Sequence, residues 1–309
     1  MPWHLKFADV REDPAIEAAL VHQTGSDAVL LVASAGCTAL TLAQRFPDVA
    51  LTVFDWNPLQ LAHVQHKSRA AMNGDLRALN VGTDDPRGLN QRGEFEGLFR
   101  TLRGFVEEFV APAADIGAYF RGDLDPSEWL SSPYWEAAFE TAFNTPFLHA
   151  MFGPAATQHA EPGSYPAYFR RAFERGLRRS DGRHNPFLQH VLLGAYLPED
   201  APAYVRSRSP ASIEAVLGSL PDVPDLSRFG LVSLSNLFDW SDDAHTSACA
   251  DALGTLRPGA AILIRQLNNQ RNLRAFFEPA FTFDDGLGAS LWDQDRSLFY
   301  NRIEVGFRR

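Results

Sequence analysis

The chain has 309 residues, enough for one large domain or for a core with a sizeable insertion. Its net charge of −10 argues against a general nucleic-acid binder, whose surface would be basic. The longest apolar run falls well short of a membrane span, and the start, MPWHLKFADVREDP, lacks the basic head and apolar core of a signal peptide. The two cysteines, Cys37 and Cys249, have no paired spacing, which favours a reducing compartment and no structural metal. We therefore expect a cytoplasmic protein.

A first helix is predicted over residues 14–22, and an alternation of strands and helices follows it. The continuous apolar run at residues 28–33 predicts a strand buried on both faces of a parallel sheet. A turn of small residues (34–38), a helix (38–46) and a second strand (49–54) come next, and that strand ends on Asp55. This order of elements is the βαβ unit typical of nucleotide-binding sheets.

The turn at residues 34–38 indicates which ligand the unit suits. Backbone N–H groups at a helix start can bind a carboxylate or phosphate, and an acid ending the second strand can bind a ribose. Only Gly36 remains of a G-x-G-x-x-G pattern, because alanines stand at residues 33 and 35. Alanine does not adopt a positive φ at low cost, so a nucleoside without phosphates fits better than a dinucleotide. S-adenosylmethionine is the commonest such ligand on this fold, and a βαβ unit without any ligand is the alternative.

Residues 58–72 predict a strong helix with Pro58 in its first turn. His63 and His66 lie three residues apart on it, but without a third ligand nearby, hydrogen-bonded or solvated histidines are favoured over a metal site. Between residues 73 and 202 the α/β rhythm stops, and helices are predicted over 95–110, 126–143, 166–180 and 185–196. We interpret this region as a helical insertion over the cofactor edge of an α/β domain formed by residues 1–72 and 203–309.

One segment of the insertion, residues 165–190, combines an apolar stripe with arginines. Phe169, Phe173 and Leu177 recur every four residues on one helical face, and six arginines crowd the rest: Arg170, Arg171, Arg175, Arg178, Arg179 and Arg183. Such a helix suits an anionic membrane surface or an anionic substrate group. The alternative is a solvated helix whose stripe faces the core of the insertion and whose arginines are offset by nearby acids.

The α/β pattern resumes at residue 203. We predict a weak third strand at Tyr204 and Val205, a helix over residues 212–220 that begins near Ser212, and a strong strand over 230–236. A helix over 242–256 and a strand over 261–266 follow. Residues 281–283 and 298–307 predict a closing antiparallel hairpin.

Several sequence blocks resemble one enzyme family: REDP at residues 11–14, ASAGCTAL, FDWNPLQLAHVQHKSRAA, SLSNLFDW and DRSLFYNRIEV. They are similar to the S-adenosylmethionine:diacylglycerol 3-amino-3-carboxypropyltransferases, which make the first intermediate of betaine lipids. The D-x-N-P-x-Q pattern that begins at Asp55 is the most specific block. The resemblance implies a Rossmann-like class I S-adenosylmethionine-dependent methyltransferase fold. This is an α/β fold with a mostly parallel seven-stranded sheet, an antiparallel final strand and, here, a helical insertion.

We expect the cofactor to lie across the ends of the first two strands. Asp55 would bind the ribose, and the turn Ser34, Ala35 and Gly36 would lie beneath the methionine part. The further predicted cofactor contacts are Trp56, Asn57, Gln60, Asn236, Phe238, Asp239 and Arg265, with Arg206 as an alternative to Arg265. Structural roles stay open for some of them: helix capping for Asp55 and Asn57, core packing for Trp56 and an ion pair for Arg265.

An alcohol acceptor is a poor nucleophile, so a general base within hydrogen-bond reach is expected. The candidates are Asp239, which follows the fourth strand, Tyr300, which the resemblance favours, and the histidines His190 and His149. The histidines can equally be hydrogen-bonded core residues, and Tyr300 can pack in the final hairpin.

Positioning decides which carbon next to the cofactor's sulfonium reacts. The resemblance implies transfer of the 3-amino-3-carboxypropyl group to the hydroxyl of a diacylglycerol-like lipid. For a cytoplasmic protein with such an acceptor, the expected place of action is the inner face of the membrane. Methyl transfer to a small or lipid substrate is one alternative, and a non-catalytic nucleoside- or lipid-binding protein is another.

Overall fold

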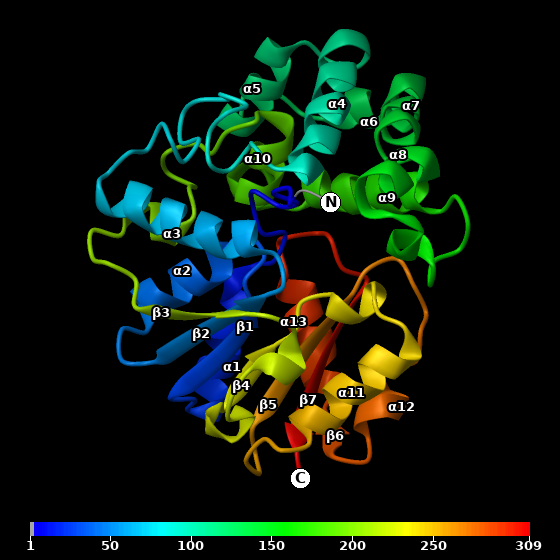
Figure 1. Ribbon diagram of the computed structural model, residues 1–309. Helices are drawn as coiled ribbons and strands as arrows, with labels where there is room; N and C mark the ends of the chain where they lie inside the picture. The colour runs from blue at the N-terminus through cyan, green and yellow to red at the C-terminus, as the bar shows by residue number, and fades with distance from the viewer. Residues whose placement is uncertain (1–2) are drawn as a thin grey trace.

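The computed structural model describes residues 3–309 and contains one seven-stranded sheet in the order β3-β2-β1-β4-β5-β7-β6 (Figure 1). The strands are β1 (Ala28–Val32), β2 (Ala50–Asp55), β3 (Ile213–Leu217), β4 (Leu231–Ser233), β5 (Ala261–Gln266), β6 (Phe281–Phe283) and β7 (Arg302–Arg308). Strands β1 to β5 are parallel, and β7 pairs antiparallel with both β5 and β6. The predicted α/β, Rossmann-like architecture with an antiparallel final strand is therefore confirmed.

Helices cover both faces of the sheet, which explains why its central strands are apolar throughout. In β1, Val29 and Leu31 face one apolar cluster, while Leu30 faces another. The first cluster includes residues of α1 (Pro14–Thr24), α2 (Cys37–Arg45), α3 (Pro58–Met72) and α13 (Asp285–Gln294); the second includes residues of α11 (Asp243–Leu253) and α12 (Arg274–Phe277). Helices α1, α2, α3 and α11 lie close to their predicted bounds, whereas α12 and α13 were not predicted.

The helices between residues 94 and 192, here called the cap, lie above the sheet in Figure 1. They are α4 (Glu94–Phe109), α5 (Ala113–Arg121), α6 (Ser127–Ser131), α7 (Pro133–Ala142), α8 (Thr145–Phe152), α9 (Tyr165–Arg178) and α10 (Pro186–Leu192). An aromatic core holds them together, with the rings of Phe143 and Phe169 centred 4.3 Å apart. The predicted helix over 126–143 is two helices, α6 and α7, because Ser132 and Pro133 start a new helix there. Helices α5 and α8 were not predicted.

Helix α9 has the predicted apolar stripe, and the stripe faces the core of the cap. Phe169, Phe173 and Leu177 are all buried. Acids neighbour several of the arginines: Arg170 pairs with Glu136 and Glu174, Arg178 with Glu174, and Arg179 with Asp181. Docking of this helix to an anionic membrane stays a prediction. None of the helices within residues 3–309 has the length and apolarity needed to cross a bilayer.

The structure corrects the prediction for residues 203–220. Tyr204 and Val205 are buried, but they lie in a 3₁₀ turn, Ala203–Arg206, and not in a strand. The third strand is instead β3, within the segment predicted as a helix. Its register with β2 runs from Leu51 opposite Ile213 to Asp55 opposite Leu217, and this pairing satisfies the backbone groups on the side that faces β2. Since β3 is an exposed edge strand, its side chains lack the burial pattern that marks the inner strands.

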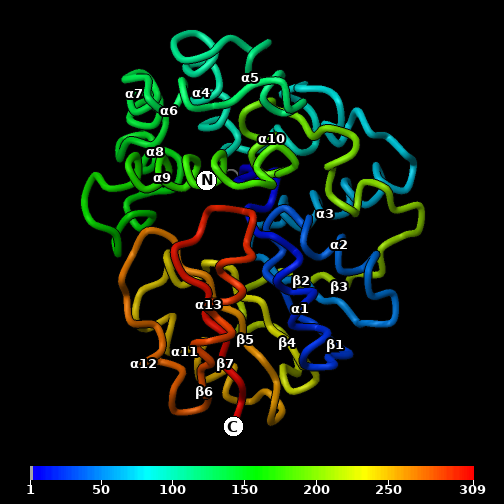
Figure 2. The backbone as a smooth tube through the Cα atoms, turned by 180° about the vertical axis from the view of Figure 1, so that it is seen from behind, coloured from blue at the N-terminus to red at the C-terminus, as the bar shows by residue number. Residues whose placement is uncertain are grey.

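The C-terminal segment also differs from its prediction. Strands β6 and β7 pair as predicted, but α13 separates them, so they do not form a hairpin. Strand β7 begins at Arg302, and Leu298, Phe299 and Tyr300 belong to the aromatic core of the cap. Figure 2 shows this red segment rising from the sheet toward the cap. The final loop thus joins the two parts of the molecule.

A buried ion-pair network links α1 to β5 beneath the cap. The guanidinium of Arg265 donates to both carboxylate oxygens of Glu17, over 2.6 and 3.1 Å, and its Nη1 lies 3.4 Å from Glu12. Arg265 and Glu17 are fully buried. A buried charge of this kind is stable only while it keeps its partner, because its desolvation cost is otherwise not offset.

We predict that Glu17→Ala lowers the free energy of unfolding by about 3–5 kcal/mol, because it leaves Arg265 without its bidentate partner. Urea denaturation followed by circular dichroism measures the change. The control is Glu136→Ala, which removes an exposed partner of Arg170 and should change the free energy by less than about 1 kcal/mol. Equal effects of the two substitutions would contradict the assignment.

Candidate functional site

A cavity of about 790 Å³, here called the main cavity, lies between the carboxyl ends of the strands and the cap. Ser34 follows β1, Asp55 ends β2, and Ser235 and Asn236 follow β4; all four line the cavity. Strand β1 lies between β2 and β4, so the order of the sheet reverses at this point. Ligands of open α/β sheets bind at such a reversal, on the side of the carboxyl ends.

The main cavity has a polar side and an apolar side. The sheet supplies the polar residues, and the opposite wall is largely aromatic: Phe7, Phe95, Phe152, Phe169 and Phe299. These rings pack on one another, with Phe169 and Phe299 centred 5.2 Å apart and Phe95 and Phe152 centred 5.6 Å apart. The blue N-terminal segment before α1 runs between the sheet and the cap in Figures 1 and 2, and its residues close the space between the two sides.

Asp55 is a buried acid at the polar side of the main cavity. One carboxylate oxygen accepts a hydrogen bond from the backbone N–H of Asn57, over 2.9 Å. Burial raises the pKa of Asp55 to about 6, against the opposing effect of the Asn57 and Ser34 backbone groups. Asn57 itself caps α3 through Leu59 N and donates to the carbonyl of His4, so capping is the role its side chain has here. Asp55 is therefore an acid that borders the cavity and does not cap α3.

The turn after β1 divides its residues between the cavity and α3. Ser34 lines the main cavity with a φ of 44°. Ala35 is buried, and its carbonyl accepts a hydrogen bond from Lys67. Gly36 has a φ of 80°, and a Cβ added there would lie 2.7 Å from a methyl group of Val64. Hence Gly36 lets α3 approach the turn, and Ala35 and Gly36 do not line the cavity.

Gln60 and Trp56 also border the main cavity. The amide of Gln60 donates to the carbonyls of Ser34 and Phe7 and accepts from the backbone N–H of Lys6, so it fastens the N-terminal segment to the turn. Trp56 is 69 % exposed and meets Trp3 edge to face, with ring centres 5.2 Å apart. Trp56 is thus a rim residue and not a core aromatic.

The residues after β4 reach the cavity only in part. Asn236 lines the main cavity. Phe238 is instead buried against Phe277, in the apolar cluster that includes residues of α11 and α12. Asp239 accepts hydrogen bonds from Leu267 N (2.8 Å) and Asn269 (2.6 Å), and it does not line the cavity. Burial raises the pKa of Asp239 to about 6, against these hydrogen bonds. The structure therefore does not bring Asp239 to the position expected of a base.

The other candidates for a base or for carboxylate binding lie outside the main cavity, apart from Tyr300, which lines it. His190 is buried between Arg11 and Gln91, and burial, followed by the charge of Arg11, lowers its pKa to about 3. His149 is hydrogen-bonded to Thr157. Arg265 is held by Glu17, and Arg206 donates to the carbonyls of Pro198 and Glu199. The observed contacts of His190 are those of a hydrogen-bonded core histidine, and those of Arg265 are an ion pair.

Sequence reasoning missed Glu12, which lines the cavity beside Tyr300. One oxygen of Glu12 accepts hydrogen bonds from the hydroxyls of Ser235 and Tyr300, the latter over 3.3 Å. Burial raises the pKa of Glu12 despite the nearby Arg265. The only signal for Glu12 in the sequence is its place in the REDP block at residues 11–14, which resembles the family but does not by itself indicate a site residue.

The carboxylates that line the main cavity outnumber the cationic side chains. The acids are Asp9, Glu12, Asp55 and Asp242, and the bases are Lys6 and Arg11. Side chains outside this set pair with members of both signs: Lys6 lies 2.5 Å from Glu94, Asp9 lies 3.8 Å from Lys67, and Glu12 lies 3.4 Å from Arg265. A cavity lined by more carboxylates than cationic side chains favours a ligand that carries positive charge.

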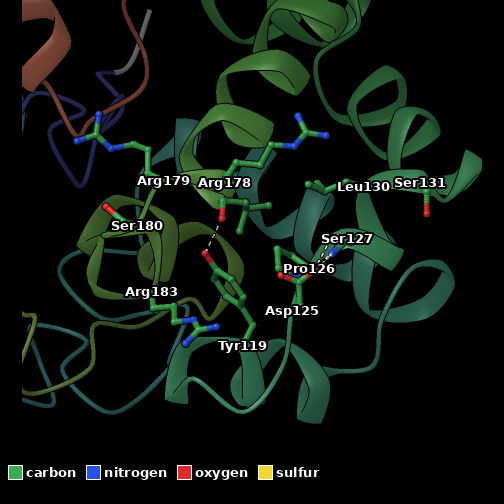
Figure 3. Close-up of a pocket in the computed structure, with 11 residues that line it drawn as sticks. Tyr119, Asp125, Pro126, Ser127, Leu130, Ser131, Arg178, Arg179, Ser180 and Arg183 are labelled. Carbon is green, nitrogen blue, oxygen red and sulfur yellow. Dashed lines mark hydrogen bonds between the residues drawn. The ribbon is translucent and has the colours of Figure 1, made fainter.

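A second cavity of about 430 Å³ lies within the cap, next to α5, α6 and the end of α9 (Figure 3). Arg178, Arg179 and Arg183 are among its lining residues, and the hydroxyl of Tyr119 donates to the carbonyl of Leu177 over 3.0 Å. Figure 3 shows the guanidinium groups of Arg178 and Arg179 pointing in opposite directions. The arginines therefore do not converge on one ligand position, and no residue predicted for the cofactor site lies there.

His63 and His66 each contact Arg92, at 3.2 and 3.3 Å, as expected of hydrogen-bonded histidines. Within residues 3–309 there is no group of three or more His, Cys, Asp or Glu side chains that could hold a metal ion. Comparisons of the chain with protein-family models, curated proteins and solved structures find no match. Function is therefore inferred from the fold, the main cavity and the residues that line it.

We predict that Gly36→Ala destabilises the protein more than Gly25→Ala does. Both glycines have a positive φ, which costs alanine about 1–2 kcal/mol, but a Cβ at Gly25 has no atom within 4 Å. Only the alanine at residue 36 meets Val64. Most of the additional loss should be removed in a Val64→Ala background, which keeps only the Cβ contact at 3.1 Å, as measured by a double-mutant cycle of unfolding free energies. A cost of Gly36→Ala that is the same with and without the Val64→Ala substitution would contradict the packing role.

Proposed function

We propose that this protein is an S-adenosylmethionine-dependent transferase that moves the 3-amino-3-carboxypropyl group to the hydroxyl of a diacylglycerol-like lipid. The structural observation that supports the cofactor is Asp55, a buried acid that ends β2 and borders the main cavity where the strand order reverses. The choice of the transferred group and of the acceptor rests on the resemblance of the sequence blocks. On sheets of this kind, an acid at that strand end binds the hydroxyls of a ribose. The seven-stranded sheet with its antiparallel β7 also suits the class I methyltransferase fold that the sequence blocks imply.

The residues of the polar side fit this cofactor. Asp55 would hold the ribose, Trp56 would lie beside the nucleoside, and Ser34 and Asn236 would border the sulfur-containing chain. The glycine-poor turn suits a nucleoside that lacks phosphates. The surplus of acids suits the positive charge of a sulfonium. When bound, the cofactor supplies an electrophilic carbon with a neutral thioether as the leaving group.

The apolar side supports a lipid as the acceptor. Five phenylalanines from the cap, the N-terminal segment and the segment before β7 form a wall that could hold an acyl chain. They lie opposite the strand ends, so a lipid hydroxyl can face the cofactor while its chains stay against the aromatic rings. A small polar acceptor would leave this wall without a partner.

The decisive experiment incubates the protein with S-adenosylmethionine and diacylglycerol in mixed micelles and separates the nucleoside products by chromatography. We expect methylthioadenosine together with a lipid whose mass has increased by one aminocarboxypropyl group. Samples without protein and without lipid correct for spontaneous breakdown of the cofactor. S-adenosylhomocysteine would instead indicate methyl transfer, and no product would indicate a non-catalytic binding protein.

A binding experiment tests Asp55 independently of turnover. Methylthioadenosine is a suitable ligand, since it carries the ribose but neither the sulfonium nor the amino-acid group. Because an ionised carboxylate accepts hydrogen bonds from both ribose hydroxyls, affinity should fall as pH decreases below about 6, on the order of tenfold per pH unit. Asp55→Asn should bind at least about tenfold more weakly at pH 7.5, with little dependence on pH.

Isothermal titration calorimetry between about pH 5 and about pH 8, a range that brackets the pKa of Asp55, measures both the pH dependence of the affinity and its loss in Asp55→Asn. The matched control is Asp85→Asn, which changes a partly exposed acid in a loop outside the main cavity. Equal affinity of Asp55→Asn and wild type at pH 7.5 would exclude the ribose role.

A further inference from the structure

One carboxylate lies where the polar and apolar sides of the main cavity meet. Glu12 is bonded to Ser235, which follows β4 on the polar side, and to Tyr300, which is adjacent to Phe299 of the aromatic wall. A lipid acceptor that lies along the wall presents its hydroxyl at this boundary. A group that acts on that hydroxyl has to lie there too.

The contact distances in the network show that Glu12 is the less closely paired of the two carboxylates beside Arg265. One guanidinium, that of Arg265, serves two carboxylates. Its bidentate hydrogen bonds go to Glu17, which also accepts from Ser233 and is fully buried away from the main cavity. The remaining contact, to Glu12, is longer at 3.4 Å. Glu17 is thus the structural partner of Arg265, and Glu12 is the carboxylate available at the cavity wall.

The other acids of the main cavity have different partners. Asp9 lies within ion-pair distance of Arg11 and Lys67 and accepts from the thiol of Cys37. Asp242 caps α11 by accepting from His245 N. Asp55 lies at the end of β2, on the other side of β1 from the residues that follow β4. None of these three acids joins a polar strand end to the aromatic wall, as Glu12 does.

We propose that Glu12 is the general base that accepts the proton of the acceptor hydroxyl, with Ser235 and Tyr300 as positioning residues. This inference rests on the proposed function, because it assumes a hydroxyl acceptor and a sulfonium donor. In the step, the hydroxyl oxygen forms a bond to the terminal carbon of the aminocarboxypropyl group. The carbon–sulfur bond breaks, its electron pair stays on sulfur as a neutral thioether, and the hydroxyl proton moves to Glu12 and then to water.

The surroundings of Glu12 act on its pKa in both directions. Burial and the negative charge of Glu17 raise the pKa of Glu12, while Arg265 and the hydroxyls of Ser235 and Tyr300 lower it. These groups come from α1, β5 and the segments next to β4 and β7. Loss of one hydroxyl donor should raise the pKa further, because hydrogen bonds to a carboxylate favour its charged form.

The primary test is the isosteric variant Glu12→Gln. We expect kcat to fall about 100-fold or more, since general bases contribute factors of that order, while the affinity for methylthioadenosine, which carries no sulfonium charge, stays within about twofold by calorimetry. Asp55→Asn should show the opposite pattern, with weakened binding. If Glu12→Gln turns over like the wild type, Glu12 is not the base although the transferase assignment stands. If the wild type neither binds the cofactor nor releases methylthioadenosine, the proposed function and this inference both fail.

A second experiment follows the ionisation of Glu12 directly and uses a variant that keeps the carboxylate. In protein labelled with ¹³C at the glutamate carboxyl, the Glu12 resonance is identified by its absence in Glu12→Gln. It should titrate above about 4.3, the ordinary value for glutamate, and higher still in Tyr300→Phe. The lower apparent pKa in the pH profile of kcat/KM should rise together with this titration in Tyr300→Phe. The assignment is overturned if the Glu12 resonance titrates at or below the ordinary value. It is also overturned if the apparent pKa from kcat/KM does not change with the pKa of the resonance.

Discussion

The arrangement of the site depends on the buried ion pairs of Arg265 with Glu17 and Glu12. Arg265 lies near the end of β5, and its partners Glu17 and Glu12 belong to α1 and to the segment just before it. Because a buried arginine is stable only with carboxylate partners, it holds the N-terminal segment against the carboxyl ends of the strands. That segment closes one side of the main cavity, so a stability requirement of the core also shapes the site.

The cap supplies the other side of the main cavity. Its aromatic core extends into the segment before β7, where Phe299 and Tyr300 lie between the cap and the sheet. Further hydrogen bonds join the two parts: Lys6 donates to the carbonyl of Met151, and His159 contacts the carbonyl of Ser241. The sheet therefore presents polar strand ends to a wall built by another part of the chain. This division suits a polar cofactor and an apolar acceptor that meet at one boundary.

The sequence predicts those features whose signal is local. Strands β1, β2 and β5 and helix α3 follow from short apolar runs and a capped helix start, and the structure confirms them within a residue or so. Strand β3 is predicted wrongly because an exposed edge strand forms only through its pairing with β2.

The role of Glu12 has no local signal in the sequence, since its partners Ser235 and Tyr300 lie 223 and 288 residues away. Arg265 and Glu17 are 248 residues apart, and Arg265 borders no part of the cavity. Asp55 could be found because both its strand and the acid at the strand end are visible in one short segment.

The most direct measurement is a crystal structure of the protein with methylthioadenosine. The account predicts a nucleoside across the ends of β1 and β2, with both ribose hydroxyls within hydrogen-bond distance of the Asp55 carboxylate and the sulfur on the side of Asn236 and Glu12. A nucleoside bound elsewhere, or a ribose that does not contact Asp55, would contradict it.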